Sequence, residues 1–365
     1  MQPAGFKCEK MAAELRHRIT AGEYPRGGRL PAAPDLAQSF GVSYVTAQKA
    51  LQLLAHDGYI TLKKHVGSTV TYIQDAPQPT RKVVNLLTTI SEHPALQEFL
   101  DDGREIFAAA GWEVRTFRLP DGDFLPDAAL KAVTSPDAYS VFFEIRSAFQ
   151  NTLASQDHFY ERAIYIGEYL TDQRLTCITS DEVENVRAVL EHFRSQGRTR
   201  TGIFRYGPDD LTENLRINTW RNEMMAHGAS FQWCLDHVFN CVPSNDYGDT
   251  QWIHDDFAEL LSARRLADID SLFIPLERHA ALFERLCAEN GIVIPRDLAI
   301  ATQGVDSCVN TASPKLSHVD NRIALHLEIA LDILEKRLAG TPVPPQLFTF
   351  YPTFIAADSS RCRPK

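Results

Sequence analysis

The side chains of the first eighty residues that could do chemistry are cations and hydrogen-bond donors. Lys63, Lys64 and His65 form a basic run close to a glycine, and Gln48 and Lys49 stand earlier in a stretch of mixed polar and apolar residues. Glutamine can make two hydrogen bonds to adenine, and lysine can contact a phosphate group or guanine. These residue types indicate contacts to nucleic acid rather than bond-breaking chemistry.

Short helices are predicted to lead up to these side chains. Met11, Leu15 and Ile19 recur every four positions, and this spacing predicts a helix over residues 7–21. A second, shorter helix is predicted over residues 33–40, where a glycine follows and ends it. Both segments would bury one apolar face.

A third helix is predicted to follow almost at once, with Ser43 as its N-cap. Val45, Ala50, Leu51 and Leu54 are predicted to form its inward-facing stripe. Two short helices joined by a tight turn that contains glycine are typical of a helix-turn-helix. The first candidate site is therefore carried by the third helix.

The basic run lies between two β-rich segments, residues 59–62 and 68–72, which predict a two-stranded wing. The whole stretch from Met11 to Val70 resembles the DNA-binding domain of the GntR family, in order and without gaps. The pieces that carry the resemblance are Gly22, Gly28-Arg29-Leu30-Pro31, Leu36-Ala37, Gly41-Val42-Ser43, Thr46, Ala50-Leu51, Leu54, Asp57-Gly58-Tyr59-Ile60 and Gly67-Ser68.

The resemblance implies that the start of the third helix enters the major groove and that the wing reaches the DNA backbone or minor groove. This sequence has Tyr44 and Gln48 where arginine is usual, Ala33 where glutamate is usual, and His65 in place of a wing glycine. The operator preference of the family is therefore not transferable. For the two wing lysines, a solvated wing tip is the alternative. The candidate DNA-binding residues are Arg29, Ser43, Tyr44, Thr46, Gln48, Lys49, Lys63, Lys64, His65 and Gly67.

Charge and composition divide the chain of 365 residues into a small and a large part. Residues 1–80 hold nine Lys and Arg against six Asp and Glu, whereas the whole chain carries a formal charge of −10. Residues 74–82 are polar and contain two prolines, which is typical of an extended linker. We expect a DNA-binding domain over residues 1–73, a linker over 74–82 and a second domain over 83–365.

The cysteines and the apolar segments restrict the class of protein. Seven scattered cysteines include no pair two residues apart, so neither a zinc site nor a disulfide framework is predicted, and we expect no metal or cofactor. No stretch approaches the roughly 18 apolar residues of a membrane span, and the first fifteen residues lack the apolar core of a signal peptide. The expectation is a cytoplasmic protein without a membrane partner.

Beyond the linker, β-rich runs alternate with amphipathic helical stretches, which predicts parallel sheets. About 285 residues are many for one sheet, so two doubly wound subdomains are expected in an α/β fold. The predicted strands are residues 83–89, 139–145, 163–166, 177–180, 201–204, 271–275 and 298–302. The predicted helices are residues 95–110, 184–195, 216–227, 280–290 and 322–338.

The order of landmarks resembles the effector-binding domain of the LacI/GalR family, which is related to periplasmic sugar-binding proteins. The resemblance covers nearly all of residues 83–360 at low identity. It implies two lobes around a ligand cleft, a second strand that begins where residues 107–114 leave the first helix, and a final strand near residues 352–359. The residues that carry it are Phe107 to Val114, Thr179-Ser180-Asp181, Val189 to Gly197, Arg216 to Trp220, Asn290 to Ile300, Gly304 to Ser307 and Pro314 to Asp320.

This second resemblance indicates which residues contact a ligand. Ligands in open α/β sheets bind beyond the carboxyl ends of strands, so polar residues directly after β-rich runs are the candidates. In the family, such carboxylates and an arginine hydrogen-bond sugar hydroxyls or the polar groups of a purine, and Tyr247 or Trp252 would supply an aromatic face. The candidate effector-binding residues are Ser91, Glu92, Arg146, Asp181, Arg216, Tyr247, Glu277, Asp306 and Asp320.

Several of these candidates have a structural alternative. Asp181 could instead cap the helix that follows it, and Arg216 and Asp320 could form a structural ion pair. Leu276 and Glu277 stand where Asn-Asp is common in the family. Residues 91–94 replace the usual aspartate and Asn-Pro-Phe sequence after the first strand, which indicates an effector other than a common hexose.

The sequence therefore predicts a DNA-binding transcription regulator, a repressor controlled by a sugar or sugar derivative and acting as a homodimer on double-stranded operator DNA. The alternative is a cytosolic solute-binding protein without a DNA-linked function. An enzyme is not expected, because no Ser/His/Asp, Cys/His or metal-ligand spacing stands out and no lysine is set for a Schiff base.

Overall fold

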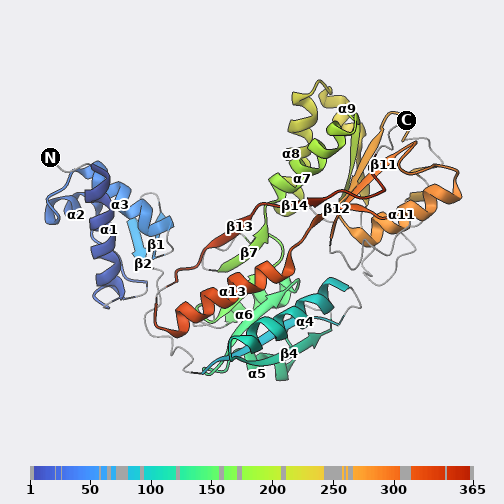
Figure 1. Ribbon diagram of the computed structural model, residues 1–365. Helices are drawn as coiled ribbons and strands as arrows, with labels where there is room; N and C mark the ends of the chain where they lie inside the picture. The colour runs from blue at the N-terminus through green and yellow to red at the C-terminus, as the bar shows by residue number, and fades with distance from the viewer. Residues whose placement is uncertain are drawn as a thin grey trace. The chain divides into compact units, whose positions relative to one another are not determined.

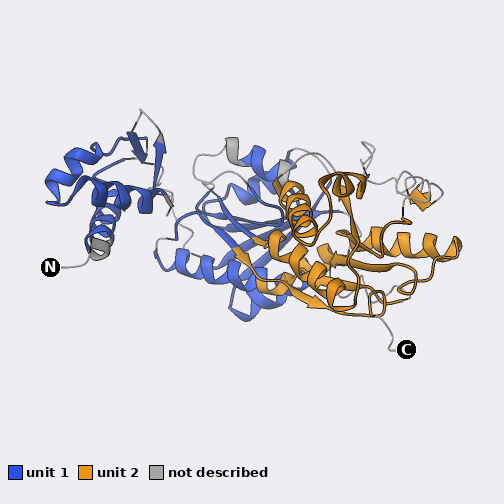
Figure 2. Ribbon diagram, turned by 90° about the horizontal axis from the view of Figure 1, so that it is seen from above, with its two compact units in different colours: residues 1–90, 100–178, 326–348 blue, residues 91–99, 179–325, 349–365 orange. Residues whose placement is uncertain are grey.

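The computed structural model divides into two compact units, which are described separately. The first comprises residues 1–90, 100–178 and 326–348, and the second comprises residues 91–99, 179–325 and 349–365 (Figure 2). No helix in the described part of the chain is long and apolar enough to cross a membrane. The residues that the structure describes are 4–20, 22–25, 27–56, 59–63, 67–70, 81–90, 94–120, 124–155, 160–170, 175–206, 211–241, 257–258, 260–261, 266–304, 314–341 and 343–361.

The first unit begins with a winged helix-turn-helix (Figure 1). Helices α1 (Ala4–Thr20), α2 (Ala33–Ser39) and α3 (Tyr44–His56) precede strands β1 (Ile60–Lys63) and β2 (Gly67–Val70), which pair antiparallel. The predicted stripe of α1 is confirmed. These elements share one core, whose members include Met11, Leu15, Ile19, Leu36, Leu54 and Ile60.

The predicted inward stripe of α3 is wrong at one position. Val45 is 59% exposed, whereas Ala47, Ala50, Leu51 and Leu54 are buried. At 100° per residue the last four lie within one helical face, and Val45 falls on the opposite face. The helix therefore presents an apolar side chain outward near its N-terminus.

The first unit also contains a six-stranded sheet in the order β13-β7-β6-β5-β3-β4. The five strands from β3 to β7 pair in parallel, and their order is that of a doubly wound fold. Its strands are β3 Val83–Thr89, β4 Glu113–Leu119, β5 Tyr139–Phe143, β6 Ala163–Ile166, β7 Thr176–Ser180 and β13 Leu347–Phe350. Its helices are α4 Pro94–Ala109, α5 Asp127–Val133, α6 Arg146–Ser155 and α13 Ile323–Leu338.

Both faces of this sheet are covered by helices. On one face, Val133 of α5 and Phe149 of α6 share a core with Phe142 of β5. On the other face, α4 approaches β3 so closely that a Cβ atom on Gly103 would lie 2.5 Å from the Leu86 side chain. A parallel sheet covered on both sides explains why all five residues of β5 are buried.

The second unit repeats this architecture with a sheet in the order β14-β12-β11-β10-β8-β9. The strands from β8 to β12 pair in parallel, and β14 pairs antiparallel to β12. Its strands are β8 Thr201–Tyr206, β9 Val238–Cys241, β10 Ser271–Ile274, β11 Ala299–Gly304, β12 Ser317–Asp320 and β14 Thr353–Ile355. Its helices are α7 Glu182–Ser195, α8 Leu211–Ala226, α9 Phe231–Asp236 and α11 Glu277–Glu289.

Successive residues of a strand in this sheet pack against helices on opposite faces. Phe204 of β8 packs with Phe283 of α11, whereas its neighbour Ile203 packs with Trp220 of α8. This alternation follows from the two-residue period of a strand. It places α7 and α8 on one face of the sheet and α11 on the other.

The predicted fold of two doubly wound sheets and a winged helix is confirmed. The prediction missed strands β9, β12 and β13 and helices α5, α6 and α9, which are short or poorly patterned. The boundary at residues 74–82 stays a prediction, because residues 71–80 lie outside the described residues.

Truncating the core face of α3 is expected to destabilise the winged helix. Leu54→Ala removes a wholly buried side chain and should lower the free energy of unfolding by about 2–5 kcal/mol. Amide hydrogen exchange of α1 and α3 in the full chain measures this. Gln52→Ala, at an exposed position of the same helix, is the matched control and should change exchange little. Equal effects of the two variants would contradict the assignment of faces.

Candidate functional site

The exposed face of α3 is the first candidate site. Tyr44 is 52% exposed, Gln48 and Lys49 are also exposed, and the helix contains no acidic residue. Ser43 caps the helix, because its Oγ accepts a hydrogen bond of 3.2 Å from the backbone N–H of Thr46. The first turn is thus fixed by its own cap while its outward side chains stay accessible.

The wing adds a second basic position. Arg29 is exposed and bridges to Thr69 of β2, and the Leu30 N–H donates to the Ser68 carbonyl at 3.0 Å. Gly67 opens β2 with φ +103°, a conformation that side chains other than glycine rarely adopt. Lys64 and His65 and the side chain of Lys63 lie outside the described residues.

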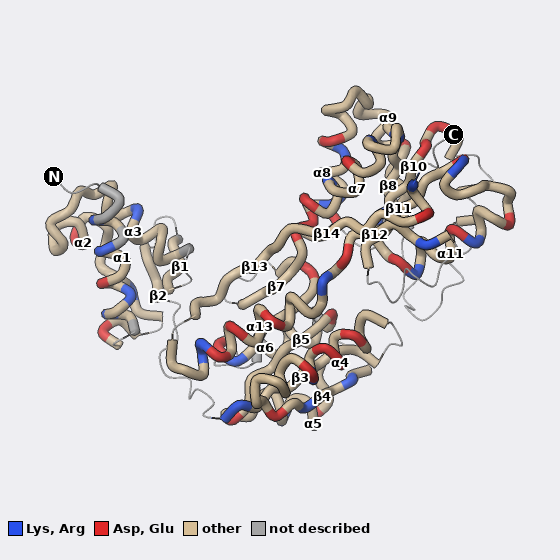
Figure 3. Tube along the Cα trace, viewed as in Figure 1, with Lys and Arg blue, Asp and Glu red and all other residues tan. Residues whose placement is uncertain are grey.

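Basic residues are also present on α1, where Figure 3 marks them in blue. This helix carries four Lys and Arg against two Glu, and Arg18 pairs with Glu14 at 2.9 Å. One of the four basic residues of α1 is thus partly neutralised by an acidic neighbour.

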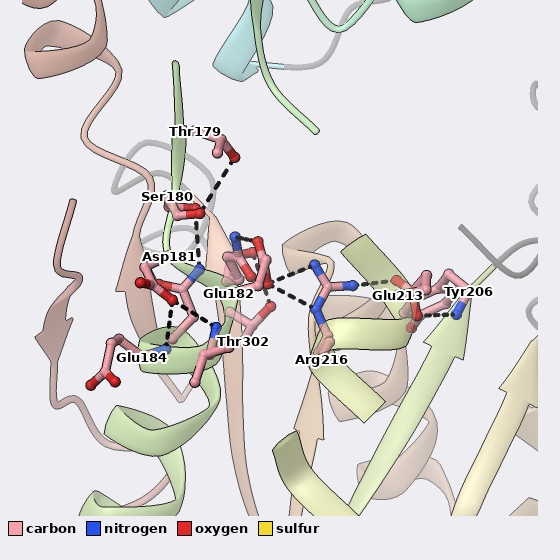
Figure 4. A network of polar contacts seen from close by, with 12 residues as sticks. Thr179, Ser180, Asp181, Glu182, Glu184, Tyr206, Glu213, Arg216 and Thr302 are labelled. Atoms are coloured by element: carbon pink, nitrogen blue, oxygen red, sulfur yellow. Dashed lines mark hydrogen bonds and ion pairs between the residues drawn. The ribbon is translucent and has the colours of Figure 1, made fainter. Parts of the chain in front are cut away.

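The second candidate site is a polar cluster in the second unit, formed by Glu182, Glu213, Arg216 and Gln303. Figure 4 labels its three charged members, Glu182, Glu213 and Arg216. The Arg216 guanidinium lies between two carboxylates: its Nε donates to Glu182 at 3.1 Å, and another of its nitrogens donates to Glu213. Arg216 is only 6% exposed and Glu182 only 3% exposed. Buried charges require such pairing, because desolvation of a lone ion is costly.

Two strands anchor this polar cluster at their carboxyl ends. The Gln303 amide near the end of β11 donates to Glu182 at 3.1 Å, and the N–H of Tyr206, the last residue of β8, donates to Glu213 at 3.3 Å. The Gln303 Oε1 atom is buried and has no hydrogen-bond partner among the described residues. Ligands of such sheets bind beyond this edge, so the cluster lies where a ligand is expected.

Glu277 lies at the same edge of the sheet, as the first residue of α11 after β10. It is 4% exposed and packs on Gly304, where an added Cβ atom would lie 2.8 Å from the Glu277 Cβ. A larger residue than glycine at position 304 would therefore clash with the Glu277 side chain.

Asp181 and Asp320 each have a structural role. Asp181 Oδ1 accepts hydrogen bonds from the N–H groups of Val183 and Glu184 at 3.0 and 3.1 Å, so it caps α7. Asp320 Oδ1 accepts from the Arg322 N–H at 2.9 Å. These bonds do not test whether the carboxylates also contact a ligand, which stays a prediction.

The structure brings together some of the predicted residues and adds others. Arg216 and Glu277 lie at one edge of the second sheet, with Glu182, Glu213 and Gln303, which sequence reasoning missed. One signal was available for Glu213, because it precedes Arg216 by three residues on one helical face. Four predicted residues lie outside the described part of the chain: Ser91, Glu92, Tyr247 and Asp306. The side chain of Arg146 is also outside it.

An aromatic pair also borders this edge of the sheet. The rings of Tyr206 and His279 lie 4.8 Å apart between centroids. The predicted aromatic residues Tyr247 and Trp252 lie outside the described residues. Within the described part of the chain, no three His, Cys, Asp or Glu side chains are grouped so that they could hold a metal ion.

Two family models match different parts of the chain. Residues 7–70 match the bacterial regulatory proteins of the gntR family, and residues 190–360 match the periplasmic binding protein-like domain. The fatty acid metabolism regulator protein of Haemophilus influenzae is 39% identical over 56 residues, which are 15% of this chain and 23% of that protein. The chain spans between 13% and 26% of the length of the curated relatives it matches.

Solved structures match over most of the chain. A complex of the transcriptional regulator CelR with cellobiose has a TM-score of 0.62 at 14% identity and covers 90% of this chain and 100% of its own. A LacI-family transcriptional regulator from an Arthrobacter species in complex with lactose has a TM-score of 0.63 at 16% identity, over 77% of this chain and 100% of its own. The chain thus joins a gntR-type helix-turn-helix to a domain with the LacI-family fold.

Removal of the Arg216 charge is expected to destabilise the second unit. Arg216→Met leaves Glu182 and Glu213 buried without their shared cation and should lower the free energy of unfolding by about 3–5 kcal/mol. The loss is measured as faster amide hydrogen exchange in α7 and α8 of the full chain.

Arg187 provides a matched control for this variant. It also contacts two carboxylates, Glu184 at 2.7 Å and Glu223 at 3.1 Å, but its side chain is 50% exposed. Arg187→Met should cost at most about 1 kcal/mol, since exposed ion pairs contribute little. If both variants behaved alike, burial of the Arg216 cluster would not have the energetic role assigned to it.

Proposed function

Because residues 7–70 form a gntR-type helix-turn-helix domain and the larger part shares the LacI-family fold, we propose that this chain is a sequence-specific transcription regulator. In this proposal it is a repressor whose operator affinity changes when a small molecule binds. The observation that carries the proposal is the outward face of α3, with Gln48 and Lys49 exposed and no acidic residue in the helix.

In the proposed complex, α3 enters the major groove of double-stranded DNA. Gln48 and Lys49 then reach base edges or phosphates, and Tyr44 donates to a phosphate. Arg29 and the wing residues contact the backbone. A single winged helix buries little surface, and half-sites are normally read in pairs, so the regulator acts as a homodimer in the cytoplasm.

The proposed effector is a sugar or another neutral molecule rich in hydroxyl groups. Two observations support this class: similar solved structures hold cellobiose and lactose, and the polar cluster of the second unit consists mainly of acceptors. Arg216 is already engaged by two carboxylates, so it is poorly suited to neutralise an anionic ligand. The buried Gln303 Oε1 offers an acceptor to a hydroxyl group.

Asp181, Glu277 and Asp320 complete the proposed set of ligand contacts, together with the predicted residues outside the described part. Asp181 keeps one oxygen, Oδ2, that its capping bonds do not use. A ligand that binds one conformation better than the other shifts the population competent for DNA. Its effect on operator affinity cannot exceed its differential affinity for the two states.

Binding of DNA should depend on salt and on Lys49. The full chain should bind a duplex from the region upstream of its own gene, and its affinity should fall as salt rises. If Lys49 neutralises one phosphate, Lys49→Ala should reduce the slope of log affinity against log salt by about one. Fluorescence anisotropy at several salt concentrations measures both.

The control for this experiment is Lys336→Ala. Lys336 is an exposed lysine on α13, its side chain 53% accessible and paired with Asp332. The salt slope of this variant should equal that of the unchanged protein. Absence of salt-dependent DNA binding by the unchanged protein would refute the proposed function.

A neutral sugar should raise the melting temperature of the full chain. A ligand that binds only the native state adds about 2.7 kcal/mol of stability at one hundred times its Kd. The screen compares mono- and disaccharides, pentoses, sugar acids and purines. Gln303→Met should weaken the active sugar by about tenfold, because a hydrogen-bond acceptor is lost. If only sugar acids raised the melting temperature, the proposed ligand class would be wrong.

A further inference from the structure

Val45 is an apolar side chain of the winged helix that the described fold does not bury. It is the second residue of α3 and is 59% exposed, while the buried face of the helix is formed by Ala47, Ala50, Leu51 and Leu54. A β-branched residue in a helix is less favourable than alanine by up to about 0.7 kcal/mol. Packing in the described structure does not compensate for this cost.

The surroundings of Val45 are polar. Gln48 and Lys49 lie one helical turn after Val45, and Gln52 lies two turns after it. All three are exposed. Single exposed apolar residues are common on protein surfaces, so exposure alone indicates little. The position is what distinguishes this one, because side chains in the first turn of a recognition helix are those that reach base edges.

The major groove offers one apolar group to such a side chain. Adenine, guanine and cytosine present only donors and acceptors there, whereas thymine also presents its 5-methyl group. An isopropyl group against a donor or acceptor would remove water from it and give no hydrogen bond in return. Contact with a methyl group has no such cost.

We propose that Val45 packs against the 5-methyl group of one thymine in each half-site and thereby specifies T·A at that position. The inference rests on the proposed function, since it requires that α3 enters the major groove. It adds a specificity determinant to the polar contacts of Gln48 and Lys49. Those side chains carry hydrogen-bond readout, and Val45 carries apolar readout.

The test removes the methyl group and nothing else from the DNA. Duplexes that bind the full chain are first selected from a random-sequence pool. In one selected duplex, each thymine is then replaced in turn by deoxyuridine. We expect one thymine per half-site at which the replacement weakens binding by about fourfold, the value of one buried methylene-sized group. The other thymines serve as internal controls.

Val45→Ala completes the thermodynamic cycle. This variant should keep its melting temperature, because alanine suits a helix at least as well as valine. It should bind the selected duplex more weakly, and deoxyuridine at the sensitive position should then have no further effect. In a duplex where C·G replaces T·A at that position, 5-methylcytosine in place of cytosine should strengthen binding of the unchanged protein but not of Val45→Ala.

The outcomes separate this inference from the proposed function. If the protein binds selected DNA but deoxyuridine weakens it equally in both proteins, or in neither, Val45 does not contact a thymine methyl group and the inference is overturned. If no duplex is selected and none binds, the proposed function falls, and the inference falls with it.

Discussion

The apolar face of α3 is the constraint on which the DNA-binding surface depends. Ala47, Ala50, Leu51 and Leu54 fit the helix against α1 and α2, and this packing decides which residues point outward. The alanines of this face are as fully buried as the leucines. When that face packs against the core, the opposite face of the helix is exposed, and it carries Val45, Gln48 and Lys49. The recognition surface is thus a consequence of the core.

The second unit shows a related dependence at its polar cluster. Glu182, Glu213 and Arg216 come from two helices, and they meet because both helices pack on one face of the same sheet. Hydrogen bonds from the ends of β8 and β11 then hold the carboxylates in place. A preformed set of buried acceptors pays little ordering entropy on binding, which favours a small, hydroxyl-rich ligand.

Sequence reasoning succeeded where a local pattern determined the structure. The spacing of Met11, Leu15 and Ile19 located α1, and the β-rich run of residues 83–89 matched β3 at both ends. It failed at Val45, because apolar character alone does not say which face of a short helix is buried. It missed Glu182, because the contact to Arg216 spans 34 residues and arises only from the sheet topology.

In the proposed regulator, ligand and operator bind to one molecule and each changes the affinity for the other. Thermodynamic linkage requires that the factor by which ligand changes DNA affinity equals the factor by which DNA changes ligand affinity. The most direct measurement titrates the full chain with operator in the presence and absence of the active sugar, and then with sugar in the presence and absence of operator. We expect two equal factors that differ from one. Factors of one in both titrations, with both ligands bound, would contradict it.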